Sequence, residues 1–111
     1  MIMHKNLANG RWFELSLVEQ LSNVGSEVGR TINWKKKNNI EFSQKAFERA
    51  LELLDLTIMD PKNRKRLKEV LRVREFLVDH FMCHSQYGYT DESWERYFYY
   101  FAYVVAARNG K

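Results

Sequence analysis

Residues 51–70 read LELLDLTIMDPKNRKRLKEV, and two helices meet within this stretch. Asp60 and Pro61 form a helix start, because an aspartate side chain caps free backbone N–H groups and proline fits the first helical turn. The apolar periodic segment before them ends at Met59, so the next helix begins almost where this one stops. Such a short connection predicts that the two helices fold back on each other as a hairpin.

Four helical segments are predicted along the chain, and no segment reads as a strand. They cover about residues 16–37, 40–59, 61–82 and 91–108. The first segment opens with a capping box, in which the side chains of Ser16 and Glu19 satisfy each other's backbone N–H groups. Four helices of this length joined by short loops predict an all-α, antiparallel up-down-up-down four-helix bundle.

The composition is that of one globular domain covering residues 1–111, with 45% apolar and 29% charged residues. A single cysteine excludes an internal disulfide and is typical of a reducing compartment. The N-terminal residues lack the apolar segment of a secretory signal, so we expect a cytoplasmic protein. The longest apolar run falls short of the roughly 20 residues that span a bilayer, so no membrane partner is expected.

Five cations gather at the start of the third helix: Lys62, Arg64, Lys65, Arg66 and Lys68. Positive charge opposes the helix dipole at that end, so helix stability does not account for the cluster. Cations beside free backbone N–H groups indicate an anion site, with nucleic acid or another polyanion as the ligand. The formal net charge of +4 agrees with this interpretation. The alternative is an ordinary solvated face.

Arg74 falls near the middle of the apolar face predicted for the third helix. A buried guanidinium without a partner costs several kcal/mol, so a carboxylate is expected beside it. Glu19 and Glu27 border the apolar face of the first helix, and the sequence predicts a structural ion pair between Arg74 and one of them. The alternative is an arginine that faces a dimer groove and contacts a substrate.

Residues 74–80 read REFLVDH, which places His80 six positions after Arg74. An arginine and a histidine at this distance in a small helical protein resemble the R-x(4–6)-H motif of HEPN-domain proteins. The resemblance implies metal-independent RNA cleavage at a homodimer interface, with Arg74 holding the scissile phosphate and His80 acting as general acid or base. Glu75 stands where the commonest form of the motif has asparagine.

Cys83 and His84 follow His80 by three and four positions. With Asp79 or His4 as a fourth ligand, these three side chains could bind zinc. This is not the spacing of a known zinc motif, and the helix is expected to fray near Cys83, so neither a metal nor a cofactor is predicted. The sequence has no glycine-rich phosphate loop, G-x-S-x-G motif or cysteine-based catalytic set. It therefore favours a binding or adaptor protein over an enzyme, with a HEPN-like ribonuclease or toxin as the alternative.

The last helix is aromatic on every side. Trp94, Phe98, Phe101 and Val105 form one stripe, and one stripe is enough for packing within a four-helix protein. Four further rings remain to be covered: Tyr97, Tyr99, Tyr100 and Tyr103. Tyrosine suits a partly wet interface, so these residues predict a homo-oligomer, most simply a dimer. The alternatives are base stacking on the tyrosines or a monomer that keeps their hydroxyls hydrated.

Gly25 and Gly29 lie beside the apolar face of the first helix. Each glycine costs about 1 kcal/mol relative to alanine in a helix interior. Another helix that approaches closely, from the same chain or from a partner, would offset this cost, and such an approach is predicted.

Overall fold

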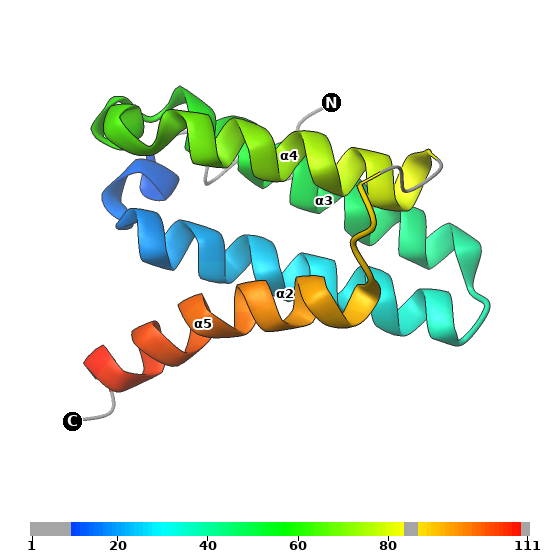
Figure 1. Ribbon diagram of the computed structural model, residues 1–111. Coiled ribbons are helices and arrows are strands. Elements are labelled where there is room, and N and C mark those ends of the chain that lie inside the picture. The colour runs from blue at the N-terminus through cyan, green and yellow to red at the C-terminus, as the bar shows by residue number, and fades with distance from the viewer. Residues whose placement is uncertain (1–9, 84–86, 110–111) are drawn as a thin grey trace.

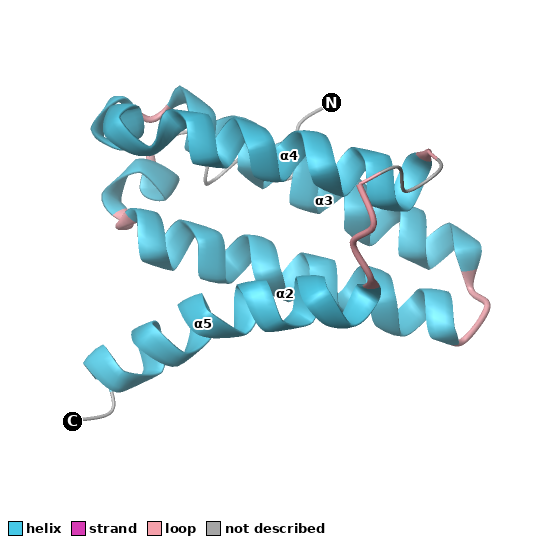
Figure 2. Ribbon diagram, in the orientation of Figure 1, coloured by secondary structure: helices cyan, strands magenta, loops and turns pink. Residues whose placement is uncertain are grey.

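The computed structural model describes residues 10–83 and 87–109, which form four α-helices and two short 3-10 helices (Figure 1). The α-helices are α2 (Leu17–Lys36), α3 (Ile40–Met59), α4 (Leu67–Met82) and α5 (Asp91–Asn109). The 3-10 helices are η1 (Arg11–Glu14) and η2 (Pro61–Arg66). Figure 2 shows only helices and loops in this part of the chain, which confirms the all-α class and the four helices. None of these helices combines the length and the apolarity needed to cross a membrane.

Local sequence signals set the start of α2 and the boundary between α2 and α3. The predicted capping box is present, because the Ser16 hydroxyl accepts from the Glu19 N–H and the Glu19 carboxylate accepts from the Ser16 N–H. Asn38 follows the end of α2 with a φ of 60°, a left-handed conformation that asparagine tolerates. The side chain of Asn39 then accepts from the N–H of Phe42 at 3.0 Å and so begins α3.

The third predicted helix begins later than expected. Asp60 is the cap, as predicted, and its Oδ1 accepts from the backbone N–H of Lys62 at 3.1 Å. Residues 61–66 nevertheless form the 3-10 helix η2, and α4 begins only at Leu67. The side chain of Asn63 is buried and hydrogen-bonded to other elements, and this tether holds the chain in the tighter 3-10 turn.

A buried polar cluster joins η1 and η2 to α2 and α3. The Gln20 Nε2 donates to the Trp12 carbonyl at 3.0 Å and to the Asp60 carboxylate at 2.8 Å. The Asn63 Nδ2 donates to Gln20 Oε1 at 2.8 Å and to the Thr57 carbonyl at 2.9 Å. The Trp12 Nε1 donates to the Thr57 hydroxyl at 3.2 Å. Because these side chains are buried and bonded to one another, they hold the basic turn of η2 in a defined place.

The core lies where α2 packs against α3 and α5, and α4 packs on α3. Its buried apolar residues in the α-helices are Leu21, Val24, Val28 and Ile32 of α2, Ala46, Phe47, Ala50, Leu53, Leu54 and Leu56 of α3, Val70, Val73 and Leu77 of α4, and Trp94, Phe98 and Phe101 of α5. Of the stripe predicted on the last helix, Trp94, Phe98 and Phe101 are buried in this core, whereas Val105 is half-buried. In Figure 1, α4 lies in front of α3 and α5 in front of α2, and α4 and α5 diverge away from the loop that joins them.

The two glycines of α2 have different surroundings. A Cβ atom placed on Gly25 would lie 2.7 Å from the Cβ of Phe98, so α5 approaches α2 too closely there for any other residue. A Cβ atom on Gly29 would meet nothing within 4 Å. A close helix approach within the chain is therefore confirmed at Gly25, whereas no described residue of this chain makes one at Gly29.

Candidate functional site

A groove with a volume of about 460 Å³ lies between α4 and α5 and reaches the end of η2. Its size falls within the range of about 300–1,000 Å³ that is usual for ligand pockets. The residues that line it are Lys65, Arg66, Lys68, Glu69, Arg72, Val73, Phe76, Tyr89, Ser93, Trp94 and Tyr97. Cations and aromatic rings make up most of this lining.

The cations of the groove come from η2 and from the first turns of α4. Three of the five predicted cations, Lys65, Arg66 and Lys68, line the groove together with Arg72. Arg66 pairs with the carboxylate of Glu69. Lys65, Lys68 and Arg72 have no ion-pair partner in the described part of the chain. Sequence reasoning missed Arg72, although it follows Lys68 by four positions and so lies one helical turn further along the same face.

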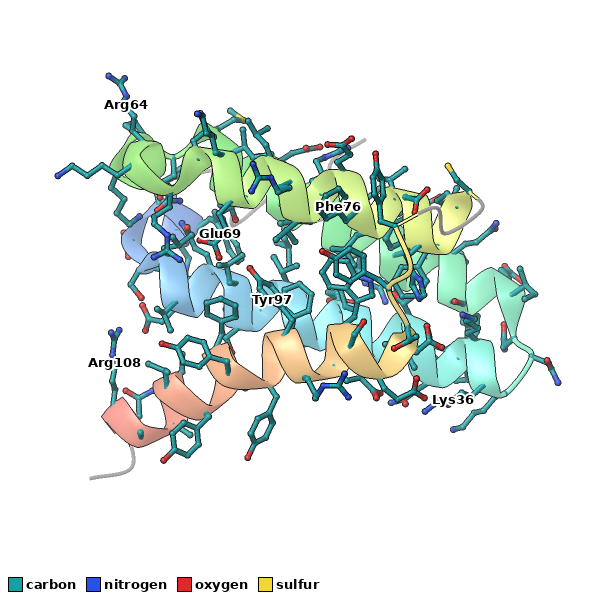
Figure 3. All side chains as sticks on the ribbon, in the orientation of Figure 1. Lys36, Arg64, Glu69, Phe76, Tyr97 and Arg108 are labelled. Carbon is teal, nitrogen blue, oxygen red and sulfur yellow. The ribbon has the colours of Figure 1, made fainter. Side chains whose placement is uncertain are left out.

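The other two predicted cations lie outside the groove. Lys62, near the start of η2, is already paired: its ammonium donates to the Asp60 carboxylate and, at 2.9 Å, to the carbonyl of Phe13. Arg64 points away from the helices at the end of the molecule (Figure 3). Of the five cations predicted for an anion site, three therefore line the groove, Lys62 binds groups of its own chain, and Arg64 points away from the helices.

A row of aromatic rings lines the groove. Phe76 of α4 lies 5.4 Å from Tyr89 between ring centroids, Tyr89 lies 4.8 Å from Trp94, and Trp94 lies 5.9 Å from Tyr97. The indole N–H of Trp94 is buried and has no hydrogen-bond acceptor among the described residues. Phe76 and Tyr89 were not singled out in the sequence, because the rings meet only when the loop before α5 returns to α4.

Glu69 and Tyr97 connect the two sides of the groove. They point toward one another in Figure 3, and the Tyr97 hydroxyl donates to the Glu69 carboxylate at 3.0 Å. Burial, together with the negative charge of Glu69, raises the pKa of Tyr97, so its hydroxyl stays protonated as a donor. The hydrogen bond to Glu69 also raises the pKa of Arg66. Tyr97, predicted for an oligomer interface, is therefore engaged within its own chain.

The ion pair predicted for Arg74 with Glu19 or Glu27 is wrong. The Arg74 Nε donates to the carboxylate of Asp55 on α3 at 2.7 Å, and both side chains are partly exposed. Glu19 closes the capping box instead, and Glu27 pairs with Arg49 of α3 at 3.2 Å. The buried face of α4 is rotated from the predicted one, so Arg74 lies at its edge beside α3 rather than in the core.

The second residue of the HEPN-like motif, His80, lies at a different helix contact. Its Nε2 is 2.7 Å from the Asp91 carboxylate of α5, which also accepts from Lys35 of α2 at 3.2 Å. Burial raises the pKa of Asp91, but the hydrogen bonds from His80 and Lys35 outweigh burial and lower it overall. Arg74 and His80 thus bind α3 and α5 respectively within one chain, and the catalytic role implied by the resemblance stays a hypothesis.

The residues considered for zinc are only partly described. Cys83 is an exposed free thiol, whereas His4 and His84 lie outside the described residues. Within residues 10–83 and 87–109 no three histidine, cysteine, aspartate or glutamate side chains gather in a way that could hold a metal ion.

The chemistry of the groove suits an anion that carries a flat apolar group. Free ammonium and guanidinium groups attract the charge, and the faces of aromatic rings accept the flat group. What the groove binds has to be inferred from these side chains, because the chain matches no protein-family model, no curated protein sequence and no solved structure.

Proposed function

We propose that this protein binds nucleic acid, with the cations of η2 and α4 contacting phosphates at the groove between α4 and α5. One observation carries the proposal: Lys65, Lys68 and Arg72 are unpaired cations beside a row of aromatic rings. Cations that neutralise phosphates gain free energy by releasing counterions from the nucleic acid. Tyr89 is exposed and Phe76 is half-buried, so these two rings offer stacking surfaces for bases, which supports nucleic acid over a polyanion without aromatic groups.

The buried polar cluster supports the same proposal. It anchors Asp60 and Asn63, and with them η2, to α2 and α3. A cationic turn held in this way loses little conformational freedom when a ligand binds, which favours affinity.

Binding of a fluorescently labelled single-stranded oligonucleotide, measured by anisotropy at several salt concentrations, tests the proposal. The double variant Lys65→Glu/Lys68→Glu is expected to lose affinity at least tenfold. For single strands each phosphate contact contributes about 0.7 to the slope of log K against log salt, so the slope should become shallower by about 1.4.

A matched control is Lys36→Glu/Lys37→Glu, which changes the net charge equally at the far end of the molecule from Arg64 (Figure 3). This control is expected to keep the wild-type salt dependence. Equal losses in both double variants would mean that only the net charge matters and would overturn the proposed surface. Absence of salt-dependent binding by the wild-type protein would overturn the function itself.

We further propose that the four helices alternate in direction as an up-down-up-down bundle. Contacts between α2 and α3 support this, because Gln20 meets Asp60 whereas Thr31, later in α2, meets Ser43, earlier in α3. The colour ramp of Figure 1 is consistent with the same alternation through α4 and α5. In that arrangement the basic start of α4 and the end of α5 belong to the same end of the molecule.

We also propose that the protein self-associates through α5. Tyr99, Tyr100 and Tyr103 are each at least 60% exposed, and Ala102 and Ala106 beside them are exposed as well. This patch carries no charge and therefore suits a self-complementary contact with a second copy. A shallow hollow of about 220 Å³ between α2 and α5, lined in part by Tyr99 and Ala102, borders the patch and could receive a partner's side chain.

A further inference from the structure

We infer that the groove between α4 and α5 holds an unpaired base of a single strand, so that the protein distinguishes single-stranded nucleic acid from duplex. This inference rests on the nucleic-acid binding proposed above and concerns the form of the ligand. The size of the groove, the position of its rings and the position of its free cations support this inference.

The rings are continuous and lie in a recess. Phe76, Tyr89 and Trp94 follow one another with centroid separations of 5.4 and 4.8 Å. The groove that they line has a volume of about 460 Å³, enough for a base and its sugar but not for a stacked duplex. A base paired within a duplex has both faces covered by its neighbours, so only an unpaired base can lie against these rings.

The cations lie where the phosphates of such a nucleotide would be. Lys65, Lys68 and Arg72 follow the same side of η2 and α4 and line the same groove as the rings. All three are exposed and have no ion-pair partner in the described residues. A strand that runs along α4 could therefore place successive phosphates on these cations while one base turns toward Phe76 and Tyr89.

Trp94 adds an independent observation. Its side chain lines the groove, and its indole N–H is buried without an acceptor. Buried donors in native proteins nearly always have a partner, so an unpaired one calls for an explanation. Bases carry carbonyl and ring-nitrogen acceptors at their edges, which is the kind of group that this donor lacks.

The experiment compares a short single strand, the duplex formed with its complement, and a free nucleoside monophosphate. The wild-type protein is expected to bind the single strand at least tenfold more tightly than the duplex or the monophosphate. The variant Phe76→Leu/Tyr89→Leu keeps apolar volume but removes two stacking faces. It is expected to lose about tenfold in affinity for the single strand, which is the usual effect of removing a base–ring contact.

The salt dependence separates this inference from the proposed function. The ring variant should keep the wild-type slope of log K against log salt, because the phosphate contacts are unchanged. Phe42→Leu, which removes a ring that packs on Trp34 outside the groove, is the matched control and should bind as the wild type does. If the double variant does not fold, as judged by circular dichroism, Tyr89→Leu alone carries the test, since Tyr89 precedes α5 and is exposed.

Equal wild-type binding of single strand and duplex, or an unchanged affinity of the folded ring variant, would overturn the inference while the proposed function stands. Binding of the monophosphate as tightly as the single strand would also overturn it, because the occupant would then be a free nucleotide. Failure of the wild-type protein to bind any nucleic acid would overturn both proposals.

Discussion

Gly25 lies beneath Phe98, where α5 packs on α2, and the space there admits no side chain. Gly25→Ala is expected to lower the free energy of unfolding by about 1–2 kcal/mol, because overpacking costs about 1–3 kcal/mol and the gain in helix propensity returns only part of it. Gly29→Ala is the matched control: nothing lies within 4 Å of its added methyl group, so the same propensity gain should raise stability by up to about 1 kcal/mol. Urea unfolding followed by circular dichroism measures both values. A shift of the same sign in the two variants would contradict the close contact.

The ion-pair partner of a single residue, Arg74, depends on which helix lies beside it. Its charge is compensated by Asp55 at the surface, where such pairs contribute about 0.2–1 kcal/mol. Arg74 was expected in the core because helical periodicity gives the angle between residues but not the direction in which a helix faces. A rotation of the buried face toward Val70, Val73 and Leu77 is enough to move it to the edge.

Asp60 connects α3 to η2, and the stability of this junction should depend on pH. Burial raises the pKa of Asp60, but hydrogen bonds from Lys62 and Gln20 outweigh burial and hold the pKa below its ordinary value of 3.8. A lowered carboxyl pKa means that the stabilisation is complete above about 3.8 and is lost as the pH falls through the lower, folded-state value.

Asp60→Asn is therefore expected to lower the free energy of unfolding at neutral pH by about 1.5–3 kcal/mol, the usual value of hydrogen bonds to a charged group. As the pH falls below about 3.8, the difference from wild type should shrink, because the wild-type carboxylate then becomes protonated. Urea unfolding at a series of pH values measures this difference. Asp55→Asn, at an exposed ion pair, is the control and should cost less than about 1 kcal/mol at neutral pH. A difference between Asp60→Asn and wild type that stays constant down to strongly acidic pH would contradict the argument.

The whole molecule is expected to form a dimer or larger oligomer through the exposed patch of α5. Light scattering should give a mass of at least twice the 13.4 kDa of one chain at high concentration and a lower mass on dilution. Tyr103→Glu places a charge in the patch and should shift the protein to the single-chain mass. Ile40→Glu, at another exposed apolar residue on α3, should leave the mass unchanged. A wild-type mass of one chain at all concentrations would exclude self-association and leave the tyrosines as ordinary surface residues.

Several features could be predicted from the sequence because their signals act within a few residues. The capping box of Ser16 and the cap at Asp60 each act within one helical turn, and the apolar residues Leu21, Val24, Val28 and Ile32 follow one another at steps of three or four positions. The clustering of the five cations could be predicted for the same reason, and three of them line the groove.

Other features could not be predicted, because they depend on residues far apart in the chain. Tyr97 meets Glu69, which lies 28 positions earlier, and Gln20 meets Asp60, which lies 40 positions later. Gln20 falls among the apolar positions of its helix, so the sequence pattern indicated that it is buried. The pattern did not indicate which residues it would bind. The same is true of Phe76 and Tyr89, which become neighbours only after the chain has turned back from α4.

By itself, the sequence determined that this chain is helical, about where its helices lie apart from the 3-10 start of the third, and where its positive charge is concentrated. Helix caps, periodicity and local charge act through neighbouring backbone groups and need no partner from elsewhere. Only the tertiary structure decided that α4 and α5 diverge, that Arg74 pairs with α3, and that free cations and rings share one groove. The physical reason is that two helices form the walls of the groove, so its shape depends on how α4 packs on α3 and how α5 packs on α2.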